Sequence, residues 1–238
     1  MDLSFAAVAL IVFFAFFTQA AIGFGAMVIA MTLSALIYPV TTLLSWFVPL
    51  VILLSAYLLI RHHDHIDWRL FFRRILPGMG VGMVLGQALF YSLNTDILKT
   101  ALGALVMFLA GRELWRRNQT PRSVPLLPWT FAAGVVHGIF ATGGPLLVYA
   151  LNAQSLDKAT FRSTLTVVWM VMALVLAGSY LSSGQLGADD LPQIGILAAV
   201  LPLSILAGEW LHRRINPERF KTAINLLLVF CGLVLLVR

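Results

Sequence analysis

Two short glycine-containing segments, AIGFGA at residues 21–26 and ATGGPL at residues 141–146, interrupt long apolar runs of this 238-residue sequence. A helix that breaks inside a membrane leaves backbone N–H groups free, and protein, water or a ligand must satisfy them. The half-helix that follows such a break has a partially positive N-terminus, which binds anions. One glycine cluster alone would be typical of close helix packing, but paired breaks in corresponding positions indicate a substrate site.

The residues expected to line this anion site lie within or directly before the two breaks. They are Gln19, Gly23, Phe24, Gly25 and Ala26 at the first break, and His137, Thr142, Gly143, Gly144 and Pro145 at the second. Gln19 and Thr142 would supply neutral polar groups, and Phe24 is a candidate gating residue. Pro145 suits the first turn of a new helix, where its missing N–H is not needed.

His137 is the one titratable side chain near the middle of an apolar run, because the centres of these runs contain no Asp or Glu. It precedes Gly144 by seven residues, about two helical turns. An ionisable residue inside a membrane indicates a functional role, here donating a hydrogen bond to an anion or carrying a proton. The structural alternative is a neutral histidine bonded to a neighbouring helix, and the sequence leaves these readings open.

Arg162 follows Lys158 by about one helical turn, beyond the second break. It would either attract anions to the cytoplasmic side of the pathway or anchor its helix at the lipid head groups. It completes the candidate substrate-binding residues.

Membrane helices are the elements that must position these residues. Hydrophobic residues make up 60% of the chain and charged residues 11%, with a mean hydropathy of +0.93. Soluble domains have roughly 45–50% apolar residues and about 25% charged residues. This composition excludes a disordered chain, a nucleic-acid-binding module and a disulfide-stapled secreted domain. The single cysteine cannot form an intrachain disulfide. No segment alternates apolar and polar residues as a membrane β-strand does, so the predicted fold class is an all-α integral membrane protein.

The two halves of the chain share landmarks at nearly one spacing. NTDILKTAL begins at Asn94 and NPERFKTAI at Asn216, 122 residues later, and the breaks at Gly25 and Gly144 are 119 residues apart. Such self-similarity predicts an internal repeat. The predicted organisation is a first transmembrane repeat at 1–117, a cytoplasmic linker at 118–127 and a second repeat at 128–238. Each repeat would contain a broken-helix hairpin and three transmembrane helices.

The distribution of Lys and Arg predicts the orientation of the repeats. Cytoplasmic segments next to membrane helices are enriched in these residues. Fourteen of the sixteen fall on one side if residues 61–74 form a cytoplasmic loop and both broken helices are hairpins that return to their own side. Both termini then lie outside, and the repeats are inverted, a plan common among secondary transporters.

Two sequence segments resemble signatures of a known family. GFGAMVIAMTLSALIYPV at residues 23–40 and GIFATGGPLLVYALNAQSLDKATFRSTL at residues 138–165 are similar to the two repeat signatures of the TauE/SafE sulfite exporter family. The first departs from the pattern, because a richer glycine run usually stands at residues 23–25. The resemblance implies a multi-pass protein of the inner (cytoplasmic) membrane that exports small sulfur anions, among them sulfite and sulfonates such as sulfoacetate. It also favours a functional role for Arg162.

The expected partners are a small anionic substrate and the lipid bilayer, without nucleic acid or cofactor, and a homodimer is an open alternative. An enzyme is not expected: His137 has no acidic partner within a span, and no Gly-x-Ser-x-Gly occurs. A metal permease is disfavoured because the span centres hold no carboxylate, and HHDHID at residues 62–67 is interpreted as a solvated loop. An intramembrane enzyme and a permease for another small anion or a metal ion remain the alternatives.

Overall fold

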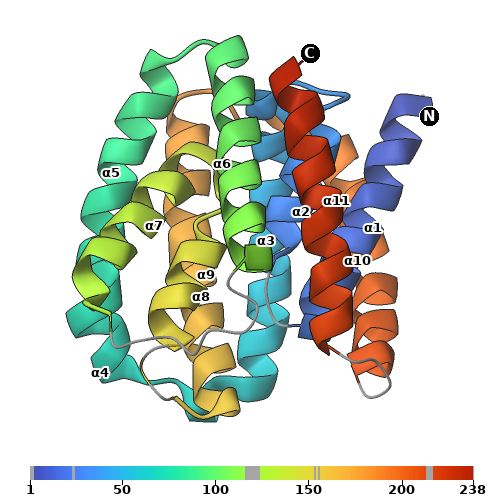
Figure 1. The fold of residues 1–238 in the computed structure, drawn as a ribbon. Helices are drawn as coiled ribbons and strands as arrows, with labels where there is room; N and C mark the ends of the chain where they lie inside the picture. The colour runs from blue at the N-terminus through green and yellow to red at the C-terminus, as the bar shows by residue number, and fades with distance from the viewer. Residues whose placement is uncertain are drawn as a thin grey trace. The chain divides into compact units, whose positions relative to one another are not determined.

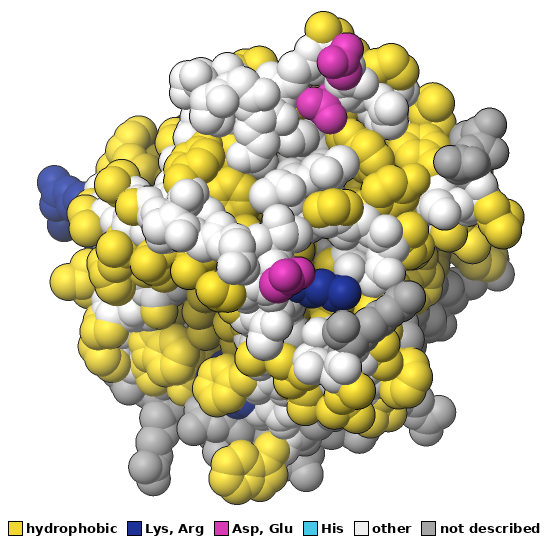
Figure 2. All heavy atoms as spheres, turned by 90° about the horizontal axis from the view of Figure 1, so that it is seen from above, with side chains coloured by type: hydrophobic (Ala, Val, Ile, Leu, Met, Phe, Trp, Pro, Cys, Tyr) yellow, Lys and Arg dark blue, Asp and Glu magenta, His cyan; other side chains and the backbone are white. Residues whose placement is uncertain are grey.

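A computed structural model describes residues 3–22, 25–115, 124–152, 154, 156–212 and 217–237. All regular structure in this part of the chain is helical (Figure 1), which confirms the predicted all-α class. Five helical segments are long and apolar enough to cross a membrane: Leu3–Ala21, Val40–Arg61, Trp68–Ser92, Ala159–Ser182 and Ala188–Trp210. Figure 2, seen from above, shows many hydrophobic side chains and few charged ones on that face.

The helices follow the same order in the two halves. The first half contains α1 (Leu3–Ile22), α2 (Ala26–Ser34), α3 (Val40–His62), α5 (Leu76–Ser92) and α6 (Thr95–Trp115), and the second contains α7 (Leu126–Phe140), α8 (Gly144–Asn152), α9 (Lys158–Ser182), α10 (Leu191–His212) and α11 (Pro217–Val237). The short helices α2 and α8 have nine residues each and begin 118 residues apart. The last helices, α6 and α11, have 21 residues each. A broken helix followed by three long helices therefore recurs, while the inverted orientation stays a prediction.

Two helices begin earlier than the sequence analysis predicted. Residues 61–74 were expected to form a loop, but 3₁₀ helix η1 (His63–His65), α4 (Trp68–Leu70) and π-helix η2 (Phe71–Ile75) lead directly into α5. Asp67 starts this run by accepting the Leu70 N–H at 2.8 Å. Asp157 likewise starts α9 by accepting the N–H groups of the first turn at 3.0 Å. The helix therefore begins at Lys158, five residues before the uncharged run that starts at Ser163. Aspartate N-caps thus extend both helices into polar sequence.

The chain divides into two compact units that do not follow the predicted repeat boundaries. Unit 1 consists of Met1–Leu44, Leu93–Gln119 and Gly195–Arg238, and unit 2 of Ser45–Ser92 and Thr120–Ile194. Each unit therefore takes helices from both halves. The first broken helix, α1–α2, belongs to unit 1, and the second, α7–α8, belongs to unit 2.

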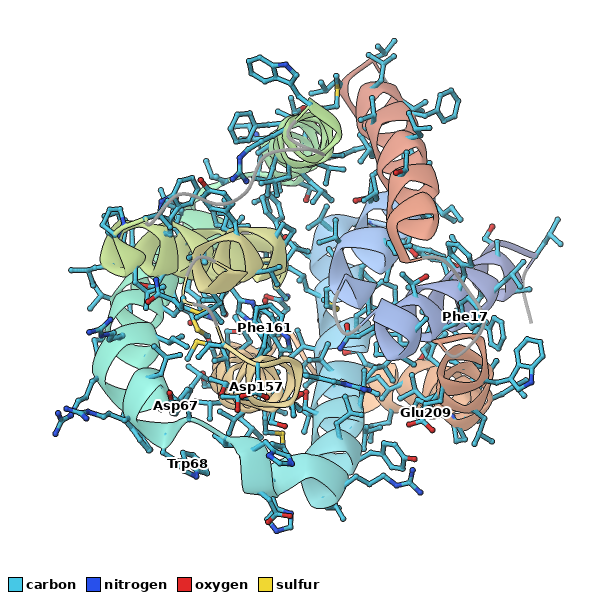
Figure 3. All side chains as sticks on the ribbon, turned by 60° about the horizontal axis from the view of Figure 1, so that its bottom comes forward. Phe17, Asp67, Trp68, Asp157, Phe161 and Glu209 are labelled. Atoms are coloured by element: carbon cyan, nitrogen blue, oxygen red, sulfur yellow. The ribbon has the colours of Figure 1, made fainter. Side chains whose placement is uncertain are left out.

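Glycines bring helices of each unit into backbone contact. In unit 2, a Cβ on Gly82 or Gly86 of α5 would overlap carbonyl oxygens of α7, and a Cβ on Gly138 would lie 2.5 Å from the Met83 carbonyl oxygen. In unit 1, a Cβ on Gly208 of α10 would lie 2.5 Å from the Phe17 carbonyl oxygen of α1. Figure 3 labels Phe17 and Glu209 near this contact. Each broken helix thus packs on the penultimate long helix of the other half, through the small residues typical of membrane interfaces.

Candidate functional site

The second break is a tight turn between α7 and α8 in unit 2. Ala141 caps α7 with a left-handed backbone, φ 54°, and its N–H donates to the His137 carbonyl oxygen at 2.7 Å. Alanine in this conformation costs about 1–2 kcal/mol, and such strain is concentrated at functional sites. The turn sends α8 back along α7 (Figure 1), so the pair returns to the end of the unit where α7 began.

The start of α8 presents backbone N–H groups that its own helix cannot satisfy. The first hydrogen bond of the helix runs from the Leu147 N–H to the Gly143 carbonyl oxygen at 3.2 Å. The N–H groups of Gly144 and Leu146 precede this bond and have no acceptor within the helix, while Pro145 has no N–H. The N-terminus of α8 therefore offers donors and partial positive charge to an anion.

Two side chains beside this helix start are buried without hydrogen-bond partners. His137 and Thr142 are each 3% exposed. Among the described residues, neither ring nitrogen of His137 nor the Thr142 hydroxyl has a partner. Buried polar groups in native proteins almost always have one. The described part of the chain thus shows no hydrogen bond from His137 to a neighbouring helix, and the role of His137 stays a prediction.

Trp169 of α9 completes this cluster, and it was not among the residues expected to line the site. Its indole stacks on the His137 imidazole, with ring centroids 5.9 Å apart and planes 15° from parallel. A Cβ on Gly144 would lie 3.7 Å from the Cζ2 and Cη2 atoms of Trp169. The indole therefore reaches from α7 to the first residue of α8. Its place near the middle of a span, away from the interfacial belts where tryptophan is common, was the available signal.

The two adjacent glycines of this break have different surroundings. A Cβ on Gly143 would overlap the Ala133 carbonyl oxygen and lie 3.0 Å from the His137 Cβ, so Gly143 allows the turn to pack against α7. Gly144 has only the ordinary contact with Trp169 described above. Close packing therefore explains Gly143, whereas no close contact requires a glycine at position 144.

At the first break, in unit 1, a side-chain oxygen of the protein accepts the first N–H of the half-helix that follows. Gly25 caps α2 with φ 103°, and the Gln19 Oε1 atom accepts the Ala26 N–H at 3.1 Å. Because the half-helices begin 118 residues apart, Gln19 occupies the position that corresponds to His137. The spacing of 119 residues between Gly25 and Gly144 would instead pair His137 with Thr18. Thr18 instead donates to the Phe14 carbonyl oxygen of its own helix.

Gly23 and Phe24 lie outside the described residues, so their expected contributions to the site stay predictions. The two breaks belong to different units, so an anion held jointly by both half-helices stays a prediction. The described structure brings together His137, Thr142, Gly143 and Gly144, with Pro145 in the first turn of α8.

Arg162 is half-buried on α9, seven residues before Trp169 and so on the same face, about 10 Å along the axis. Figure 3 labels Asp157 and Phe161 at this end of α9, with Asp67 nearby. The Asp67 N–H donates to the Thr164 hydroxyl at 3.0 Å. Hydrogen bonds, foremost from Thr160, hold the pKa of Asp157 below its usual value. The role of Arg162 stays a prediction.

The histidine-rich segment before α4 shows an exposed ion pair, with 3.0 Å between His63 Nε2 and Asp64 Oδ1. Within the ranges that the structure describes, no group of three or more His, Cys, Asp or Glu side chains is placed to hold a metal ion.

Comparison with known proteins identifies the family. The chain is 29% identical over 167 residues to "Probable inner membrane transporter protein TsaS" of Comamonas testosteroni, covering 68% of this chain and 69% of that protein. It is 27% identical over 201 residues to "Probable sulfite/organosulfonate exporter TauE" of Cupriavidus necator, covering 81% and 77%. No solved structure matches the chain. The family described as "Sulfite exporter TauE/SafE" matches residues 8–235, and the chain therefore belongs to this family of multi-pass inner-membrane transporters.

Proposed function

We propose that this protein exports a small sulfur-containing anion, sulfite or an organosulfonate such as sulfoacetate, and holds its anionic group at the start of α8. The name of the Cupriavidus necator relative, a sulfite/organosulfonate exporter, supports this class of substrate. The repeated order of a broken helix and three long helices supports transport, because alternating access in such proteins moves one repeat against the other around a central site.

The observation that carries this proposal is the difference between the two breaks. At the first, the Gln19 amide oxygen lies 3.1 Å from the Ala26 N–H, the first N–H of α2. At the second, the corresponding residue is His137, which has no hydrogen-bond partner among the described residues. At the start of α2, the Gln19 amide oxygen accepts the first N–H of the helix. We expect a substrate oxygen to take the equivalent place at the start of α8.

The groups around α8 favour an anion over a cation. The Gly144 and Leu146 N–H groups donate only, the Thr142 hydroxyl is able to donate, and a neutral histidine has one ring N–H. A sulfite or sulfonate group has three oxygens, which would accept from several of these donors at once. The carboxylates of unit 2 lie at helix ends or in connections, at Asp64, Asp67, Asp157, Asp189 and Asp190, so none offers a cation a ligand near the middle of a span.

Replacing Thr142 tests the proposal. Thr142→Val keeps the side-chain shape and removes an unpartnered buried hydroxyl, whose burial costs about 1–3 kcal/mol. We expect the free energy of unfolding to rise or stay constant, while the affinity for sulfite or sulfoacetate in detergent falls at least fivefold. Thr32→Val is the matched control: its hydroxyl donates to the Val28 carbonyl oxygen at 2.6 Å. We expect that variant to keep its affinity. Unchanged affinity in Thr142→Val would refute the site.

Transport and catalysis are separated by the fate of the substrate. Purified protein in liposomes should move labelled sulfite or sulfonate across the bilayer chemically unchanged. Release of a chemically altered product by the protein in detergent would instead support the intramembrane enzyme, the alternative that the sequence left open.

A further inference from the structure

We infer that Trp169 sets the size of anion that the α8 site accepts; this inference rests on the proposed function. The indole is the one side chain that the structure places against both His137 and Gly144 within the described residues of unit 2. It therefore forms a wall beside His137 and the start of α8, where the bound anionic group would carry its organic substituent.

The stacking geometry determines how a ligand reaches His137. The planes are 15° from parallel and the centroids are 5.9 Å apart, so the indole lies on one side of the imidazole and is displaced laterally from its centre. The two ring nitrogens lie on the edge of the ring, and both lack partners. Stacking thus fixes the plane of the imidazole, and the buried, unpartnered ring nitrogens would be available to a ligand that enters the site. A substrate oxygen would therefore bind at the ring nitrogens of His137, and the indole would exclude large substituents from its side of the imidazole.

The six-membered ring of the indole limits space at the start of α8. Its Cζ2 and Cη2 atoms would be 3.7 Å from a Cβ on Gly144, a van der Waals contact. If an anion binds the Gly144 N–H, its organic substituent therefore comes into van der Waals contact with Trp169 after about one carbon atom. Sulfite and short sulfonates fit this space, whereas long or aromatic sulfonates overlap the ring.

Trp169→Phe removes the outer part of this wall and keeps an aromatic face over His137. The experiment measures the affinities of methanesulfonate and 1-butanesulfonate for the purified protein in detergent. In Trp169→Phe we expect methanesulfonate affinity within about threefold of wild type and a ratio of the two affinities shifted at least tenfold toward butanesulfonate, since pocket size commonly discriminates by 10–200-fold. Trp46→Phe, a buried tryptophan of α3 in the same unit, is the control and should leave the ratio unchanged.

Gly144→Ala tests the same wall without altering Trp169. Its methyl group narrows the gap, so the affinity for butanesulfonate should fall more than that for methanesulfonate. An unchanged ratio in both Trp169→Phe and Gly144→Ala, or an equal shift in Trp46→Phe, would overturn the role of Trp169 while leaving the proposed function intact. Failure of the wild-type protein to bind any sulfonate or sulfite would instead overturn the proposed function, and this inference with it.

Discussion

Alanine substitutions at the adjacent glycines of the second break should have opposite effects on stability. In Gly143→Ala the new methyl group would overlap the Ala133 carbonyl oxygen and lie 3.0 Å from the His137 Cβ. The Ala133 backbone and the stacked His137 side chain leave no room for this methyl group, so the turn must move away from α7. In Gly144→Ala the nearest atoms belong to the Trp169 ring, at 3.7 Å.

The size of each effect follows from these contacts. A carbon–oxygen contact requires roughly 3.3 Å, so Gly143→Ala forces a shift on the order of 1 Å, and overpacking of this kind costs about 1–3 kcal/mol. Gly144 begins a helix, and replacing a helical glycine by alanine contributes about 0.5–1 kcal/mol where space is available. We therefore expect the two variants to differ by about 1.5–4 kcal/mol in free energy of unfolding.

Denaturant titration of the purified variants in detergent micelles, followed by tryptophan fluorescence, measures this difference. Gly80→Ala is the control, since a Cβ on this helical glycine of α5 would meet no atom within 4 Å. It should match or exceed wild type. A Gly143→Ala variant as stable as Gly144→Ala would refute the assignment of Gly143 to packing.

Three further predictions concern hydrogen bonds near helix ends. Gln19→Leu leaves the Ala26 N–H buried without its acceptor and should lower the free energy of unfolding by about 1–3 kcal/mol in denaturant titration. Trp46→Phe removes the 3.0 Å bond from the indole N–H to Asp190 Oδ1; a double-mutant cycle with Asp190→Ala should give a coupling of about 1 kcal/mol or more. Because its hydrogen bonds lower the pKa of Asp157, their stabilisation is full above the unfolded-state pKa near 4 and is lost as pH falls through the folded-state pKa. Asp157→Ala should therefore lower the melting temperature at pH 7, and the difference from wild type should shrink as the pH falls below the unfolded-state pKa.

The sequence was sufficient to predict the helices and the breaks because both depend on local composition. Apolar runs of about 20 residues predict membrane helices, and clusters such as Gly143-Gly144-Pro145 interrupt them wherever they occur. Helix starts were less accurate. Asp67 and Asp157 extend helices into charged segments, and the apolar pattern on which the prediction relied does not register a side-chain cap.

The candidate site was predicted only in part, since its partners come from distant positions. The polar residues before each break were visible in the sequence. That Trp169 stacks on His137 depends on how α9 packs against α7, and single-sequence reasoning has no access to this. Aligning the two halves on the starts of α2 and α8 pairs His137 with Gln19, whereas aligning them on Gly25 and Gly144 pairs it with Thr18. The two alignments differ by one residue, and only the structure gives the helix starts.

This correspondence makes a final substitution informative. His137→Gln gives the second break the residue that the first break has seven positions before its half-helix. Gln19 shows that a glutamine there caps the helix with its amide oxygen, 3.1 Å from the first N–H. We therefore expect the new glutamine to accept the Gly144 N–H, raising the free energy of unfolding by about 1 kcal/mol and lowering sulfonate affinity at least tenfold, because the oxygen occupies the position of the anion. If His137 only donates a hydrogen bond, and the α8 N-terminus plays no part, glutamine still donates and affinity falls only slightly. Isothermal titration with methanesulfonate distinguishes these outcomes, and near-wild-type affinity would refute the oxygen position inferred from the first break.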